Sequence, residues 1–146
     1  MTTTADDLAA RVAEALFPRD VVANDLNMRI EDIGEGRARI SMLVTPKMMN
    51  GLNVAHGGYI FTLADTAFAY ACNSRNQATV AQHAQISFIS PVQVGETLTA
   101  EATELSQSGR NGLYDVLVKG GDGRTVAAFR GASRSVKGPT APGLTT

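Results

Sequence analysis

The chain has 146 residues, with 13 basic and 14 acidic side chains, two histidines and a single cysteine, Cys72. This length suits one domain with its own core, and the balanced charge excludes the basic surface that nucleic-acid binders and polybasic membrane anchors carry. One cysteine excludes an internal disulfide framework and, with two histidines, a closed structural zinc site. We therefore expect a single domain over residues 1–146 in the cytoplasm, without metal or cofactor, that binds a small molecule or another protein and neither nucleic acid nor a membrane.

The first part of the chain predicts a peripheral helix and a hairpin. Thr4 can cap a short helix over about residues 5–17, in which apolar residues recur at helical spacing before Pro18 ends it. Residues 27–44 alternate between apolar and polar side chains on both sides of a Gly-Glu-Gly turn at residues 34–36. This pattern is typical of two paired strands.

The second part predicts a buried helix followed by strands. Residues 58–72 are apolar on most sides when wound as a helix. Short turns favour an antiparallel meander of four strands, and a Pro/Gly/Thr tail at about residues 138–146 is expected to be flexible. The expected strands are residues 79–89, 97–105, 112–119 and 125–136. The sequence thus predicts an α+β fold in which a twisted antiparallel sheet wraps around one long central helix, an order of elements typical of the hotdog fold.

The motif His56-Gly57-Gly58 stands where the chain enters this helix. Glycines leave backbone N–H groups open to a ligand, and the first helical turn has N–H groups without intrahelical partners. Together with the positive end of the helix dipole, these groups can stabilise a developing negative oxygen. The motif is therefore a candidate oxyanion hole, although an ordinary loop-to-helix turn with His56 near the cap position is the simpler explanation of the motif alone.

A single carboxylate, Asp65, lies among apolar residues of the same helix. An unpaired carboxylate is costly to bury, so such an acid is normally paired, hydrated or lining a pocket. One interpretation is a polar seam with Thr62, Thr66 and Asn73. The other is a catalytic role, as a general base on water or as a nucleophile.

Helix geometry separates the two candidate groups. Gly57 and Asp65 are eight residues apart, which corresponds to roughly 12 Å along a helix axis, so one bound carbonyl cannot easily meet both within one chain. If two subunits pack these helices antiparallel, the start of one helix lies beside the middle of the other. A two-fold dimer then contains two equivalent composite sites.

Three segments resemble hotdog-fold acyl-CoA thioesterases of the phenylacetic acid degradation (PaaI-type) branch: MNGLNVAHGGYIFTLADTAFAYACNS, ISFISPVQVGETLTAEA and GLYDVLVKGGDGRTVAAFRG. The resemblance implies hydrolysis of phenylacetyl-CoA or a ring-hydroxylated relative, with Asp65 as catalytic carboxylate and the Gly57 N–H of the opposite subunit polarising the thioester carbonyl. It implies that Asn50 and His56 order the site, and that dimers assemble into tetramers. The family pattern also places Ser or Thr on the following strand to hold the water, whereas this chain has Ala81, and Thr79 or Gln82 is the available substitute.

Other side chains are candidates for contacts with the substrate. Phe61 and Phe68, with Met48, Met49 and Leu52 of the loop, can shape a pocket for an aromatic acyl group, although core and loop packing explains them equally well. Gly58 is a further substrate-binding candidate. Arg130, Arg134 and Lys137, on the last strand and its exit, can meet the phosphates of CoA, with scattered surface charge as the simpler explanation. We expect Cys72 to be an inert buried thiol.

Other functions remain open at this stage. A hotdog dehydratase needs a histidine base paired with an acid, and His56 is the available candidate. A non-catalytic acyl-CoA-binding module needs the pocket without the chemistry. A thioesterase for another aryl or a medium-chain acyl group needs the same machinery with a different pocket.

Overall fold

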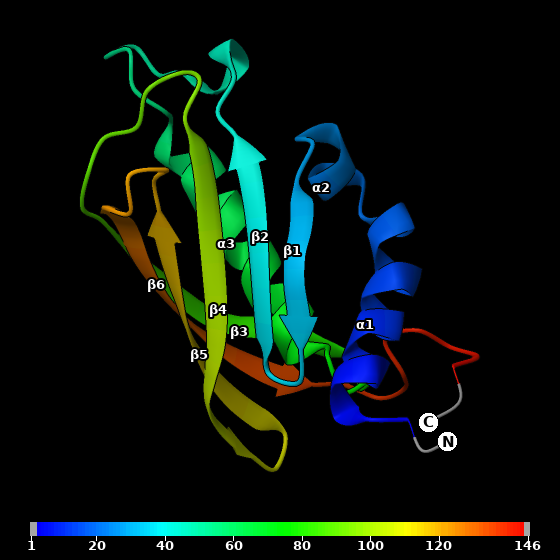
Figure 1. The fold of residues 1–146 in the computed structure, drawn as a ribbon. Coiled ribbons are helices and arrows are strands. Elements are labelled where there is room, and N and C mark those ends of the chain that lie inside the picture. The colour runs from blue at the N-terminus through cyan, green and yellow to red at the C-terminus, as the bar shows by residue number, and fades with distance from the viewer. Residues whose placement is uncertain (1–2, 145–146) are drawn as a thin grey trace.

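A long helix, α3 (Gly57–Cys72), lies against one face of a six-stranded antiparallel sheet that curves around it (Figure 1). This computed structural model describes residues 3–144. The strands are β1 (Arg29–Gly34), β2 (Arg37–Leu43), β3 (Thr79–Phe88), β4 (Thr97–Ser108), β5 (Asn111–Lys119) and β6 (Thr125–Ser135), in the order β1-β2-β4-β5-β6-β3. The predicted α+β hotdog architecture is therefore confirmed.

The core lies between α3 and the concave face of the sheet. Leu63, Ala64, Ala67 and Ala71 of α3 are completely buried and pack against alternating inward-facing residues of the strands, as period-two burial along β4 and β5 shows. Small side chains on the helix let its backbone approach the sheet closely. The apolar character of residues 58–72, which predicted a buried helix, follows from this position.

The two edges of the sheet differ. Helix α1 (Ala5–Leu16) packs along β1 and buries Ala9, Val12 and Ala13, and its predicted Thr4 cap is present as a capping box with Asp7. Strand β3 forms the other edge, is ten residues long, and has most of its side chains exposed. A long edge strand with unpaired backbone groups is a ready template for pairing with another chain.

The position of β3 corrects the expected four-strand meander. Strands β4, β5 and β6 do form a meander, but β3 pairs with β6, and β2 pairs with β4. The connection from β3 to β4 therefore crosses from one edge of the sheet to its middle. Local turn signals could not reveal this crossing, because pairing partners are chosen by tertiary packing.

Two terminal features also differ from expectation. A short helix, α2 (Val21–Asp25), follows a 3-10 turn at Phe17–Arg19 and is capped by Asp20, where no helix was predicted. Residues 138–141 are held in place, because Ala141 is buried and the Thr140 hydroxyl donates to Asn73. The flexible tail expected from residue 138 is thus not supported up to residue 141, and residues 145–146 lie outside the described part. Within residues 3–144, no helix is long and apolar enough to cross a membrane.

Candidate functional site

The turn at the start of α3 leaves one backbone donor free. His56 is the N-cap, and its Nδ1 accepts a hydrogen bond of 2.9 Å from the Gly58 N–H. This engagement places the imidazole proton on Nε2. Within residues 3–144 the Gly57 N–H has no hydrogen-bond partner. Gly57 is therefore the available donor for an oxyanion, whereas Gly58 is occupied by the cap.

A groove of about 470 Å³ opens at this end of α3. It is lined mostly by apolar side chains, with the backbone of Gly57 and the amide of Asn50 as polar groups. The other lining residues are Val54, Ala55, Ile60, Phe88, Ile89, Ser90, Pro91 and Val92. An apolar groove with a few convergent polar groups is the usual form of a small-molecule site.

Asn50 holds the loop that forms one wall of this groove. Its Oδ1 accepts hydrogen bonds from the N–H groups of Leu52, at 2.9 Å, and Val54, at 3.3 Å. Its backbone N–H donates to the Val54 carbonyl at 2.9 Å, and a bridge joins Met49 to Ala55. The expected ordering role of Asn50 is consistent with these bonds, which leave its Nδ2 directed to no partner within the described chain.

Asp65 is half-buried and has no hydrogen-bond or ion-pair partner within residues 3–144. The polar-seam interpretation fails, because Thr62 and Thr66 donate to the carbonyls of Gly58 and Thr62, and Asn73 bonds Ala69 and Thr79. Burial raises the pKa of the Asp65 carboxyl above its ordinary value of 3.8. A desolvated acid without a local partner is a candidate functional group.

Asp65 does not line the groove that contains Gly57 and Asn50. Asp65 and Gly57 belong to the same continuous helix, α3, so the separation that was expected from helical rise holds in the folded chain. A single subunit therefore presents the oxyanion donor and the carboxylate at different places along α3.

The two predicted aromatic pocket residues have different environments. Phe68 is 1% exposed, with its ring against Tyr114 and Phe129 and in the space beside Gly131. The prediction that Phe68 contacts substrate is therefore wrong, since the core encloses it. Phe61 is only partly buried and packs edge-on against Phe129, so one side of it remains accessible.

The predicted cations are also not equivalent. Arg130 forms a two-pronged pair with Asp115, at 2.7 and 3.0 Å, so its charge is already matched. Arg134 and Lys137 have no ion pair within residues 3–144.

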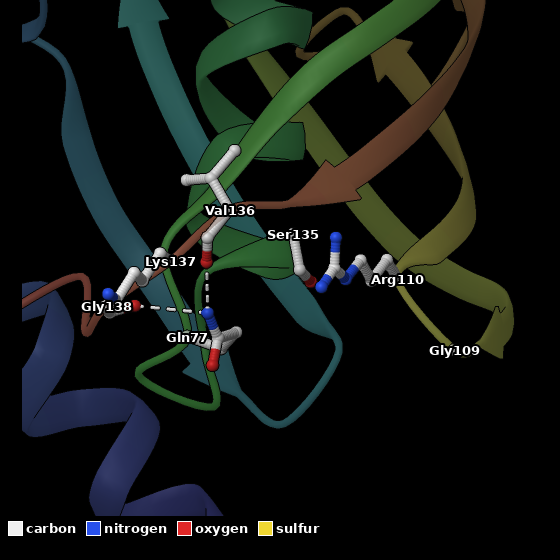
Figure 2. A pocket seen from close by; sticks show the side chains of 7 residues that line it. All are labelled: Gln77, Gly109, Arg110, Ser135, Val136, Lys137 and Gly138. Carbon is white, nitrogen blue, oxygen red and sulfur yellow. Dashed lines mark hydrogen bonds between the residues drawn. The ribbon is translucent and has the colours of Figure 1, made fainter.

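Lys137 lines a cleft of about 530 Å³ together with Arg110, a cation from the β4–β5 turn that the sequence had not singled out. Figure 2 shows Arg110 reaching towards Ser135, with Lys137 on the other side of Gln77. The side-chain amide of Gln77 donates to the carbonyls of Val136 and Gly138.

Strand β3 changes its pairing register just after Ala81, the position where the family pattern places a Ser or Thr. Ala81 pairs with the buried Ser133, and Gln82 is an extra residue in a bulge before His83. The Thr79 hydroxyl donates to the Gln77 carbonyl at 2.7 Å. Of the two expected substitutes, Gln82 is thus the one whose side chain is not engaged within the described chain, and bulges commonly re-aim side chains beside active sites.

Two further expectations concern Cys72 and metals. Burial raises the pKa of the Cys72 thiol to about 12, so it stays protonated at neutral pH. It is therefore inert, as expected from its apolar setting. Among residues 3–144, no cluster of three His, Cys, Asp or Glu side chains is arranged to hold a metal ion.

A sheet wrapped around a buried helix agrees with what comparison with known proteins shows. Residues 52–127 match the model of the thioesterase superfamily, and the chain belongs to this family. It is 44% identical over 126 residues to the acyl-coenzyme A thioesterase PaaI of Escherichia coli K12, which covers 86% of this chain and 90% of that protein. It is 33% identical over 130 residues to a putative esterase of Archaeoglobus fulgidus, covering 89% and 84%.

Solved structures agree with these sequence relatives. The E. coli PaaI protein from the phenylacetic acid degradation operon superposes with a TM-score of 0.92 at 41% identity, over 93% of this chain and 99% of that one. A PaaI variant from Thermus thermophilus gives a TM-score of 0.77 at 30% identity, over 80% of this chain and all of that one. The resemblance predicted from the sequence motifs is confirmed.

Proposed function

We propose that this protein hydrolyses acyl-CoA thioesters to the free acid and CoA, in the cytoplasm. The observation that carries the proposal is the half-buried Asp65, which has no partner among the described residues 3–144, on the same helix whose first N–H, that of Gly57, is also free within them. These two groups suit thioester hydrolysis, since a donor stabilises the carbonyl oxygen and a carboxylate can activate water. His56 is engaged as a helix cap, which disfavours the dehydratase interpretation.

The active site is composite in this proposal, with the Gly57 N–H from one subunit and Asp65 from its partner. The edge strand β3 supports the pairing, because its residues Val80 and Phe88 and the adjoining Ile89 are about half exposed, whereas the opposite edge is covered by α1. Two β3 strands joined edge to edge would continue the sheet and bring the two α3 helices together. The resulting dimers pair further into a tetramer.

In the proposed reaction, the thioester carbonyl oxygen accepts a hydrogen bond from the Gly57 N–H. The partner's Asp65 takes a proton from water as the water oxygen bonds to the carbonyl carbon, or it attacks that carbon directly to give an anhydride that water then opens. Collapse of the tetrahedral intermediate breaks the carbon–sulfur bond and releases CoA. Asn50 and His56 hold the loop and the helix start, and the amide of Gln82 is the available group to hold the water in place of Ala81.

For the acyl group we propose phenylacetyl or a ring-hydroxylated phenylacetyl. This choice is supported by the 41% identity to the E. coli protein from the phenylacetic acid degradation operon and by the partly accessible ring of Phe61. The alternatives are a thioesterase for another aryl or a medium-chain acyl group, and a module that binds acyl-CoA without hydrolysing it.

Release of free thiol from acyl-CoAs tests the proposal. Purified protein is incubated with phenylacetyl-CoA, hydroxyphenylacetyl-CoA, benzoyl-CoA and straight-chain acyl-CoAs, and thiol is followed with a chromogenic reagent. We expect release from all classes that fit, with the highest kcat/KM for the phenylacetyl esters. Equal kcat/KM for aromatic and straight-chain substrates contradicts the phenylacetyl assignment, and saturable binding without thiol release favours the binding module.

The CoA phosphates are expected to meet the free cations at the exit of β6. Replacing Arg134 and Lys137 together by glutamine should raise KM for acyl-CoA by about tenfold at low salt, with kcat nearly unchanged, because exposed charges steer and hold an anion without touching the reacting atoms. The acyl-pantetheine thioester, which lacks the nucleotide phosphates, serves as the control substrate. An equal rise in KM for that substrate would show that the loss has another cause. The matched variant Arg130→Gln should change KM less, because Asp115 already neutralises Arg130.

A further inference from the structure

The phenyl ring of Phe88, at the end of β3, lies directly over the backbone of Gly57. A Cβ atom placed on Gly57 would come within 2.9 Å of Phe88 Cζ and 3.2–3.3 Å of the two Cε atoms. Gly57 is not among the glycines with positive φ, so its backbone conformation does not itself demand glycine. A side chain at residue 57 would therefore require the Phe88 ring to shift.

The chain on both sides of the groove fixes this contact. After Phe88, the N–H groups of Ile89 and Ser90 donate to the Val126 carbonyl at 2.8 and 3.1 Å. On the other side, the Ala55 N–H donates to the Val92 carbonyl at 2.8 Å, which ties the loop before α3 to the same segment. Phe88 is thus held against the start of α3 by backbone bonds, although its side chain is 55% exposed.

The ring also forms a wall of the groove that contains the free Gly57 N–H and Asn50. An apolar wall beside a hydrogen-bond donor keeps bulk water from that donor, and a donor in a water-poor setting stabilises a developing oxyanion more strongly. An apolar ring there contributes no hydrogen bond of its own. Its contribution depends on where it lies relative to the Gly57 N–H.

We propose that Phe88 is a positioning residue for the thioester, whose ring holds the carbonyl oxygen against the Gly57 N–H, screens that N–H from water and restricts residue 57 to glycine. This inference rests on the proposed acyl-CoA hydrolysis and names a further part of the same site. The ring acts through Gly57 and takes no part in bond making or proton transfer.

A double-mutant cycle tests the proposal with phenylacetyl-CoA as the probe. Gly57→Ala in the presence of Phe88 should lower kcat by about 100-fold, since it displaces the oxyanion donor. In the Phe88→Ala background the same change should cost only about threefold, because the space for the methyl group is then free.

Phe88→Ala alone should lower kcat by about tenfold with KM within about twofold, and Phe88→Tyr should restore most of kcat. Leu105→Ala, at an exposed position on β4 that neither lines the groove nor lies on the β3 edge, is the matched control and should leave kcat within about twofold.

Thermal stability and size-exclusion chromatography of each variant accompany the kinetics. Additive effects of the two substitutions on kcat overturn the proposal, as does a loss confined to KM. Coupling in Tm without coupling in kcat also overturns it, because the ring would then only pack. If the unmodified protein hydrolyses acyl-CoA and the cycle is additive, only the role of Phe88 fails. If the unmodified protein releases no thiol from any acyl-CoA, the proposed function fails and the role of Phe88 with it.

Discussion

Replacing Asp65 by asparagine should lower kcat for acyl-CoA hydrolysis by about 10²- to 10⁴-fold, the factor that a positioned general base contributes. The amide has nearly the same shape but cannot take a proton from water or attack the carbonyl. Thiol release is the measurement, and Asp25→Asn, which alters an exposed carboxylate on α2, is the matched control. Near-normal turnover by the Asp65 variant would remove this residue from the mechanism.

The same carboxylate should set the acid limb of the pH profile. Burial raises its pKa above 3.8 in the folded chain, and hydrolysis requires the ionised form, so kcat should fall as pH decreases through this raised value. No carboxylate lines the groove beside Gly57 in the described chain, so the residual activity of the Asp65→Asn variant should lack this limb. An unchanged acid limb in the variant would assign it to another group.

Stability should change in the opposite direction to activity. Because the folded pKa is raised, the folded state binds protons more readily than the unfolded state, and the ionised carboxylate lowers the free energy of unfolding as pH rises from 3.8 through the folded value. Asp65→Asn removes that cost, so its Tm should exceed that of the unmodified protein at neutral pH. The difference should vanish below about pH 3.8, where both states are protonated. A lower Tm at neutral pH would show that Asp65 gains a stabilising partner in the assembled protein.

Two inactive variants should restore activity when they are mixed, which is the second large effect. A heterodimer of Asp65→Asn and Gly57→Ala chains contains one site with both defects and one site with neither, if each site takes its donor and its carboxylate from different subunits. Random exchange of equal amounts should then return about a quarter of unmodified activity, from a background that is lower by about 100-fold. Co-expression with two affinity tags isolates the heterodimer, which should reach about half.

The matched control mixes two variants from the same half of the site. Gly57 and Asn50 line one groove of one subunit, so Gly57→Ala and Asn50→Asp chains should not restore each other. Activity that stays at the background level in the first mixture, although size exclusion shows exchanged dimers, would place Gly57 and Asp65 in one chain's site. Full activity of a monomer would contradict the composite site altogether.

Much of the fold followed from local patterns. Alternation at residues 27–44 and 97–136 identified five strands, because one face of each strand is buried and the other is not. The all-round apolar segment identified α3, and glycine after histidine marked its start, where His56 is the cap. Strand β3 was found as a strand but placed wrongly, since its alternation says nothing about which neighbour it pairs with.

The candidate site divides in the same way. The unusual chemistry of Asp65, an acid in an apolar helix, is a sequence signal, as is the glycine pair beside His56. By contrast, Phe61 and Phe68 share a helical stripe and could not be told apart in sequence, yet one is accessible and the other is enclosed by Tyr114 and Phe129. Arg130 and Arg134 share a strand face, but only Arg130 meets an acid, because Asp115 of β5 lies opposite it in register.

The sequence by itself determined the class of fold, the central helix, the oxyanion motif and the lone carboxylate, because each depends on residue types within one or two turns of chain. Only the tertiary structure decided that β3 is an open edge, that Arg110 joins Lys137 in one cleft, that residues 138–141 are held in place and that Phe88 covers Gly57. These features join residues distant in sequence, and their contacts are set by packing and strand register. Phe88 and Gly57 are 31 positions apart, and no local pattern relates them.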